Sequence, residues 1–227
     1  MKIGLVYAMT GEIESLLTQE NAQPLQTVAG VPFYQIRPDV IACAGGVSKV
    51  NAAMATQLLI SLYQPDLVLN AGVAGCFENM PIGSIVLAEG FLQHDVDTTP
   101  LGDPIGLVST VNRVEFPTWE PERCVKLLAD MGIHAVTGRV ATGDWFAVNC
   151  KRAEFIRDTF RPVLTEQEGG AIAQVCLRNG VRFVAVKSIS DHLFSENQQE
   201  EYFNFGEALE NMGTIVLPLA RKLKEEA

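Results

Sequence analysis

Apolar runs of strand length alternate with helical patterns along the whole chain, and this alternation constrains the fold more than any other feature. The runs contain many β-branched residues and few charges, which is typical of strands that are buried on both faces. They occupy residues 3–8, 40–46, 67–72, 84–91, 139–143 and 183–191, and helical patterns lie at 49–63, 120–132, 169–180 and 204–227. We therefore expect an α/β fold with helices on both sides of a sheet.

Two further segments refine this expectation. Residues 31–37, "VPFYQIR", alternate between apolar and polar side chains and predict an early antiparallel or edge strand. Residues 98–120 form a long irregular stretch, of the kind that usually serves as a lid or an interface arm. No linker or internal repeat is visible, so residues 1–227 are expected to form a single domain. The helix at 49–63 is predicted to bury one broad face, made of Val50, Ala53, Leu58, Leu59 and Leu62.

The composition limits the partners and the compartment. With 17 basic and 27 acidic side chains, the net charge of −10 argues against binding to nucleic acid or to an anionic membrane. No apolar run reaches the ~18 residues of a membrane helix, and the first residues lack a signal-peptide pattern. The five cysteines include no CxxC pair, which disfavours a zinc or redox site and favours reduced thiols in a cytoplasmic protein.

Acidic residues follow several of the predicted strands. Glu12 follows the first strand and stands in the first turn of a helix, where the helix dipole alone would explain an acid. Glu166 and Glu168 precede two glycines that open a helix, so they serve either as helix caps or as part of a site. Asp191 ends the strand "FVAVKSISD" next to Ser190, and it caps a turn or faces a ligand crevice.

A fourth segment, "ATGDWF" at 141–146, ends another strand with the aromatic residues Trp145 and Phe146. The carboxyl ends of strands in a doubly wound sheet meet at one crevice, so the acids and the aromatic pair are expected to converge. Carboxylates beside an aromatic wall suit cleavage of a ribosyl bond to a flat base. That reaction passes through an oxocarbenium-like state and needs an acid for the leaving base and a base for water.

In these motifs the sequence resembles the nucleoside phosphorylase superfamily, and within it the 5′-methylthioadenosine/S-adenosylhomocysteine nucleosidases. The resemblance extends over the whole chain in the order of its short motifs. These are "MKIGLVYAMTGEIESL", "LVLNAGVAG", "HDVDTT", "ATGDWF", "TEQEGGAIAQVC" and "KSISD". It implies a three-layer α/β/α domain with a central mixed sheet, no cofactor, no metal, and a homodimer in which the 98–120 segment is a candidate for the subunit contact.

The resemblance also assigns roles to residues. Glu12 would activate water, Glu168 would bind the ribose hydroxyls, and Asp191, supported by Ser190, would protonate N7 of adenine and accept from its 6-amino group. Phe146 would stack on the base, and backbone groups of Ala147 would read its edge. Glu166 and Lys187 would support Glu12 near the water. The chain departs from the family pattern at Val73 (serine), Gln167 (methionine) and Lys187 (arginine). It also has Leu101 and Asp103 where the family has aromatic residues that the partner subunit contributes to the pocket for the 5′ substituent.

The alternatives to this function are a related nucleosidase of the same fold and three more distant classes of protein. A purine nucleoside phosphorylase of the same fold needs cationic donors around phosphate, whereas the first strand–helix turn offers Glu12 and no arginine. A non-catalytic nucleoside-binding protein is suggested by Val73, but the retained acids argue against it. A dinucleotide-binding dehydrogenase lacks its G-x-G-x-x-G turn. The predicted partner is thus a small-molecule nucleoside, and the preferred 5′ substituent stays open.

Overall fold

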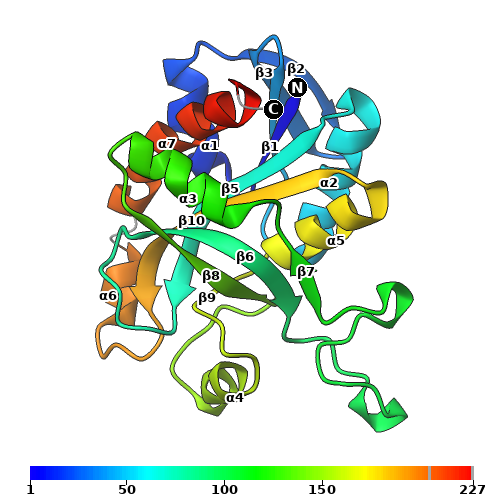
Figure 1. Cartoon of the computed structure of the whole chain (residues 1–227), viewed down its shortest axis with the longest axis vertical. Coiled ribbons are helices and arrows are strands. Elements are labelled where there is room, and N and C mark those ends of the chain that lie inside the picture. Colours follow the sequence, from blue (N-terminus) through cyan, green and yellow to red (C-terminus); the bar gives the residue numbers. More distant parts are fainter. Residues whose placement is uncertain (204–205, 226–227) are drawn as a thin grey trace.

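The computed structural model describes residues 1–203 and 206–225, and it shows a sheet between two layers of helices (Figure 1). The strands are β1 (Ile3–Tyr7), β2 (Gln23–Val28), β3 (Val31–Arg37), β4 (Val40–Ala44), β5 (Leu67–Cys76), β6 (Ile85–Gln93), β7 (Glu115–Pro117), β8 (Ala135–Thr142), β9 (Leu164–Glu166) and β10 (Arg182–His192). The α-helices are α1 (Thr10–Gln19), α2 (Lys49–Tyr63), α3 (Pro121–Asp130), α4 (Lys151–Phe160), α5 (Gly169–Asn179), α6 (Gln198–Phe203) and α7 (Gly206–Glu225).

The sheet is mixed, as expected. Its strand order is β10-β6-β8-β9-β5-β1-β4-β3-β2, with β7 paired to β6. Strands β4, β1, β5 and β10 run parallel to one another, whereas β2, β3 and β4 form an antiparallel end. Strand β10 pairs with both β5 and β6, so the strands between β10 and β5 close on themselves.

The two largest of three apolar clusters among the described residues lie on opposite faces of the sheet, because the central strands carry apolar side chains in both directions. One core packs α1, α3 and α7 against the sheet, and it includes Leu16, Leu128 and Leu219. The other packs α2 and α5, and it includes Leu59 and Ile172. Helices therefore cover both faces, which confirms the expected α/β architecture (Figure 1). None of the described helices is both long and apolar enough to span a bilayer.

The structure corrects the predicted face of α2. Its buried residues are Ala52, Ala55, Thr56, Leu59 and Ile60. Val50 is instead 75% exposed, and Leu62 is 44% exposed. The helix has apolar side chains nearly all round, so its pattern did not single out the face that packs on the sheet.

Other differences concern elements at the edges. The segment 31–37 is antiparallel to β4 as predicted, but β2 covers it, so it is not the edge strand. The 98–120 segment contains two short 3-10 turns, Thr99–Leu101 and Ser109–Val111, and then β7. The predicted helix over 204–227 is α7, whose first two and last two predicted residues lie outside the described residues.

Candidate active site

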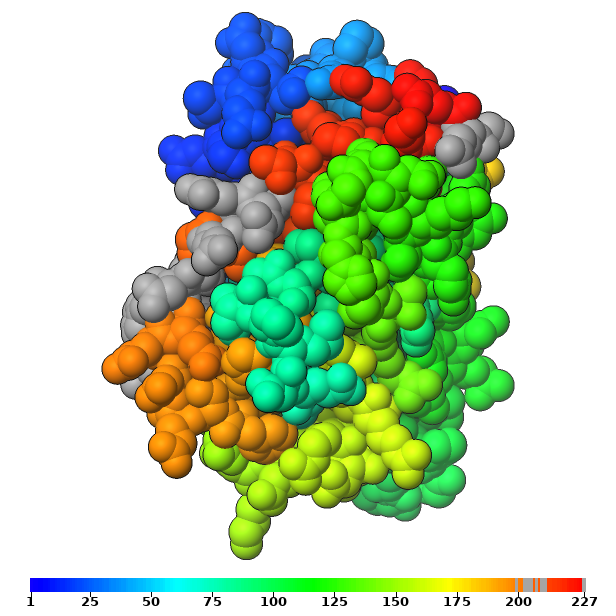
Figure 2. Space-filling view, turned by 60° about the vertical axis from the view of Figure 1, so that its left-hand side comes forward, coloured from blue at the N-terminus to red at the C-terminus, as the bar shows by residue number. Residues whose placement is uncertain are grey.

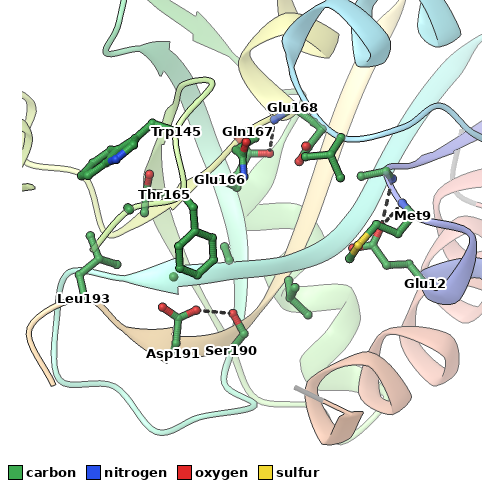
Figure 3. A pocket seen from close by; sticks show the side chains of 17 residues that line it. Met9, Glu12, Trp145, Thr165, Glu166, Gln167, Glu168, Ser190, Asp191 and Leu193 are labelled. Atoms are coloured by element: carbon green, nitrogen blue, oxygen red, sulfur yellow. Dashed lines mark hydrogen bonds between the residues drawn. The ribbon is translucent and has the colours of Figure 1, made fainter. Parts of the chain in front are cut away.

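One cavity of about 110 Å³ opens where β1, β5, β8, β9 and β10 end (Figure 3). Seventeen residues line it: Ala8, Met9, Glu12, Val47, Val73, Ala74, Gly75, Trp145, Phe146, Ala147, Thr165, Glu166, Gln167, Glu168, Ser190, Asp191 and Leu193. They include all the predicted site residues except Lys187. The convergence expected from strand ends is therefore present.

Glu12 stands in the first turn of α1, and its carboxylate turns back toward the end of β1. Its Oε2 accepts hydrogen bonds from the backbone N–H groups of Met9, at 2.9 Å, and Ala8, at 3.0 Å. The side chain is buried, and burial raises the pKa of Glu12 more than the backbone donors and Lys187 lower it. Two backbone N–H groups fix this carboxylate in place, and desolvation makes it more basic. Such a carboxylate is suited to take a proton from water.

The strand opposite Glu12 comes very close to it. A Cβ atom at Gly72 would lie 2.8 Å from Oε1 of Glu12, so a larger residue here would force the carboxylate to move. The next residue, Val73, lines the cavity with an apolar side chain, while its backbone N–H helps to lower the pKa of Glu12. The close approach of β5 leaves little room between this strand and the carboxylate of Glu12.

Glu166 has its acceptor capacity taken up within the protein. Its Oε1 accepts from the Thr142 hydroxyl at 2.5 Å, and its Oε2 accepts from the backbone of Gly169 at 2.7 Å. The Lys187 ammonium lies 3.1 Å from the same Oε2. Lys187 is thus held behind the cavity wall by Glu166, and its charge reaches Glu12 through space. Glu166 and Lys187 therefore support the wall of the cavity as an ion pair.

Glu168 precedes α5 and keeps one oxygen available to the cavity. The backbone N–H of Ser48 donates to its Oε1 at 2.9 Å. Burial, followed by the charge of Glu166, raises the pKa of Glu168 to about 7. Gln167, between the two acids, is half-buried and lines the same cavity. Ionised Glu168 can accept hydrogen bonds from a pair of hydroxyls, as a ribose presents.

Asp191 lies on the opposite side of the cavity from Glu168 (Figure 3). It is 3% exposed, and its Oδ1 accepts a hydrogen bond of 2.7 Å from the hydroxyl of Ser190. A register shift in the β10–β5 pairing occurs between Ile189 and Asp191. Successive side chains of a regular strand point to opposite faces, and this bulge allows Ser190 and Asp191 both to line the cavity.

The aromatic wall follows β8. Phe146 lines the cavity and is 43% exposed, so its ring is placed at the mouth, where it can cover a flat base. Ala147 is buried next to it. The Trp145 ring is covered by the Arg152 guanidinium, 4.6 Å from its centroid. This wall brings an apolar surface opposite the acids.

Three supporting residues were missed from the sequence. Gln198 donates from Nε2 to Asp191 Oδ2 at 3.0 Å and to the Ala147 carbonyl at 2.8 Å. Ser48 contacts Glu168 from 120 positions away, and Thr142 bridges Glu166 and the Gly170 N–H. The sequence pattern does not mark Gln198 and Thr142 as site residues, because their role depends on contacts between distant segments.

Within residues 1–203 and 206–225, no group of three or more His, Cys, Asp or Glu side chains could hold a metal ion. His94 is buried, and burial lowers its pKa to about 4. Its neighbour Asp95 is already paired with Lys49 at 2.6 Å. The carboxyl groups that line the cavity can exchange protons with a ligand.

Comparisons with known proteins agree with this geometry. The sequence model described as "Phosphorylase superfamily" matches residues 2–221. A 5′-methylthioadenosine/S-adenosylhomocysteine nucleosidase of Shewanella loihica is 38% identical over 199 residues, which cover 85% of this chain and 86% of that protein.

Solved structures show the same fold. The nucleosidase of Colwellia psychrerythraea, in complex with adenine, superimposes with a TM-score of 0.88 at 31% identity, covering 98% of this chain and 96% of that one. The futalosine hydrolase of Helicobacter pylori has a TM-score of 0.90 at 25% identity, covering 98% of each chain. These matches confirm the predicted fold and the resemblance read from the motifs. The chain belongs to the phosphorylase superfamily and, within it, to the family of 5′-methylthioadenosine/S-adenosylhomocysteine nucleosidases.

Proposed function

We propose that this protein is a nucleosidase that hydrolyses the N-glycosidic bond of 5′-substituted adenosines and releases adenine. Its relatives are named for 5′-methylthioadenosine and S-adenosylhomocysteine, and these are the substrates that we assign to the site. The observation that carries the proposal is the convergence of Glu12, Glu168 and Asp191 on one cavity that also has an aromatic wall.

Each acid takes one part of the reaction. Asp191 gives a proton to N7 of the base, which makes adenine a better leaving group. The bond between C1′ and N9 breaks, and positive charge develops on the ribose. A water molecule attacks C1′ while Glu12 removes its proton, so the products are adenine and the 5′-substituted ribose.

Binding of the substrate uses the remaining residues. Ionised Glu168 accepts from the ribose hydroxyls, Phe146 covers the base, and the backbone of Ala147 meets its edge. Gln167 and Val73 line the space around the ribose and the water. Ser190 holds Asp191, while Glu166 and Lys187 support Glu12 from behind the wall.

Electrostatics favour water over phosphate as the nucleophile. Glu12 and Glu168 face the space where the nucleophile would enter, and the neighbouring Lys187 is already paired with Glu166. A phosphate dianion there would meet like charges in a partly desolvated cavity, which costs several kcal/mol. This is the physical reason to prefer hydrolysis to the phosphorolysis that other members of this fold perform.

The test compares products with and without phosphate. Purified protein is incubated with 5′-methylthioadenosine, S-adenosylhomocysteine or unsubstituted adenosine, and adenine and the sugar product are separated by chromatography. We expect adenine and free 5′-substituted ribose at a rate that added phosphate leaves unchanged. A ribose 1-phosphate product, with turnover that rises with phosphate, would establish a phosphorylase instead. Absence of adenine release with adenine binding retained would establish a binding protein.

We infer that the protein acts as a homodimer of single-domain copies, each spanning residues 1–227. Apolar side chains are exposed near the cavity: Val47 and Phe146, which line it, are 39% and 43% exposed, and Val148 is 39% exposed. Val50 on α2 and Leu101 in the 98–120 segment are 75% and 83% exposed. A second copy would remove this surface from water. Sedimentation of the wild type and of Val50→Asp tests the proposal, because the aspartate should shift the dimer toward monomer.

We infer a cytoplasmic location from the thiols. All five cysteines are free, and Cys43, Cys76, Cys124 and Cys176 are buried. Free buried thiols are the usual state in a reducing compartment. Cell fractionation beside a cytoplasmic marker enzyme tests this, and recovery in an exported fraction would contradict it.

A further inference from the structure

Gln198 connects the two sides of the base subsite. It is the first residue of α6, its side chain is 7% exposed, and its carboxamide nitrogen lies 2.8 Å from the Ala147 carbonyl oxygen and 3.0 Å from Asp191 Oδ2. A carboxamide NH2 group has two hydrogens, so one group can donate to both acceptors at once. Gln198 thereby ties the loop after β8 to the end of β10.

The segment that carries Gln198 is anchored away from the cavity. Glu201 accepts from the backbone N–H of His192 and from the hydroxyl of Ser195, each at 2.8 Å. The ring of His192 in turn contacts the Met80 carbonyl oxygen, and in Figure 2 the orange segment around residue 195 lies against the teal segment around residue 80. The position of Gln198 is therefore set by contacts that a ligand in the cavity does not touch.

Gln198 reaches its two acceptors from outside the cavity wall. Asp191 and Ala147 belong to the described residues that line the cavity, whereas Gln198 does not. A carboxylate has about four lone-pair positions and a carbonyl oxygen has two, so both acceptors keep capacity on the cavity side. Ser190 holds Oδ1 of Asp191 and Gln198 holds Oδ2, which together fix the plane of the carboxyl group.

We propose that Gln198 is a positioning residue: it holds the Asp191 carboxyl group and the Ala147 carbonyl as one unit, and it thereby strengthens the preference of the site for a base with an exocyclic amino group. The inference rests on the proposed function, since it assumes that the base lies between these two groups. An amino group can donate to both acceptors. A 6-oxo group would place its oxygen against these two acceptor oxygens, and their lone pairs on the cavity side would receive no donor, which a site of this kind rejects.

A purely structural role for Gln198 makes a different prediction. If the side chain only attached α6 to the body of the protein, its loss would lower the stability and would weaken the binding of all bases equally. If it positions the acceptors, its loss should weaken the binding of adenine more than that of hypoxanthine, because only the amino group of adenine donates hydrogen bonds to both acceptors. The ratio of the two affinities therefore separates the roles.

The experiment measures dissociation constants of adenine and hypoxanthine by calorimetry for the full chain. Gln198→Met keeps a side chain of similar length without the donor, and Gln198→Asn keeps the amide on a shorter side chain. Glu200→Gln, an exposed position on the same helix, is the control. We expect the preference for adenine over hypoxanthine to fall about tenfold in both Gln198 variants and to stay unchanged in Glu200→Gln. Melting temperatures should stay within about 4 °C of the wild type.

The outcomes separate the two proposals because binding of free bases requires no turnover. An unchanged preference in either folded Gln198 variant would overturn the positioning role, even if the wild type releases adenine. A wild type that binds neither base would overturn it as well. If the Gln198 variants show a reduced preference for adenine while the wild type does not hydrolyse any substrate, the positioning role would be supported and the nucleosidase activity would be rejected. With an active wild type, kcat/KM for 5′-methylthioadenosine should also fall at least about tenfold in Gln198→Met.

Discussion

The Lys187 ammonium lies 3.1 Å from Glu166 Oε2, and each of these side chains is only 3% exposed. Two opposite charges that are shut off from water stabilise a structure only as a pair, because either one alone would be a buried, uncompensated charge. Lys187→Met should therefore lower the free energy of unfolding by about 3–5 kcal/mol.

Adding Glu166→Gln to Lys187→Met should restore most of that stability, since the double variant has no unpaired charge at this point. Urea denaturation of the wild type, both single variants and the double variant measures the coupling. Equal stability of Lys187→Met and the double variant would show that the pair does not act as a unit.

Replacing Glu12 by glutamine tests the base. Glu12→Gln keeps an oxygen to accept from the Ala8 and Met9 backbone but cannot take a proton, so adenine release should fall by at least about 10²-fold. A purely helix-terminal role predicts a stability loss of about 0.3–1 kcal/mol with activity preserved. Glu14→Gln, an exposed position on the same helix, is the control for an assay of turnover beside a melting curve.

Replacing Asp191 by asparagine tests the acid. Asp191→Asn keeps the shape and the hydrogen bond from Ser190 but loses the transferable proton. Adenine release should fall by ~10²–10⁴-fold, while the melting temperature changes little. Single-turnover measurements at saturating substrate isolate this step from binding. Near-full activity of the variant would remove Asp191 from the mechanism.

The raised pKa of Glu168 makes stability depend on pH. In the folded protein the pKa of this carboxyl group is about 7, against an ordinary value of 4.5, so folding favours the protonated form. The associated stability is present below the unfolded pKa and is lost as the pH rises through 7, by about 3 kcal/mol in total.

Glu168→Gln should remove this part of the pH dependence. The free energy of unfolding, measured in urea at pH 5 and at pH 8, should drop less between these values in Glu168→Gln than in the wild type. Glu12 remains in both proteins, so the difference between the two profiles reports Glu168 together with its interaction with the charge of Glu12. Identical pH profiles would show that Glu168 titrates normally.

A methyl group at Gly72 should damage the site more than the fold. Its Cβ would lie 2.8 Å from Oε1 of Glu12, whose other oxygen is fixed by two backbone donors. Gly72→Ala should thus displace the carboxylate and lower kcat by about 10²-fold. Gly11→Ala meets no atom within 4 Å and lies inside α1, so it should keep full activity and gain about 0.4–1 kcal/mol of stability. Equal activity of the two variants would contradict the close approach.

The parts of the fold that the sequence predicted are those where burial dictates composition. The run 183–191 became β10, because a strand sealed on both faces must be apolar until it ends. Strand β2 was missed because nearly all of its residues are exposed and carry no hydrophobic pattern. Helix α4 was also missed, although Ala153, Ile156 and Phe160 recur at helical spacing on its buried face.

The same reasoning divides the site. The acids were predictable because they follow strands, and strand ends converge in such a sheet. Their donors were not predictable. The N–H of Ser48 reaches Glu168 across 120 positions, and the amide of Gln198, which donates to Asp191, also reaches the Ala147 carbonyl across 51 positions. The exposed apolar residue Val50 was assigned to the core because a one-dimensional pattern does not distinguish a core face from a surface that another copy would cover.

Because of the register shift in β10, the face of the sheet to which Asp191 points depends on the number of residues that precede it in the strand. Each residue inserted or deleted between Arg182 and Ile189 would send the acid to the opposite face of the sheet, with every side chain of the site still encoded. Changes in length within this strand are therefore more harmful to the reaction than most changes of residue type. A search for inactive natural variants of this protein should weigh the spacing between the β5–β10 pairing and the Ser190–Asp191 pair as heavily as the identity of the acids.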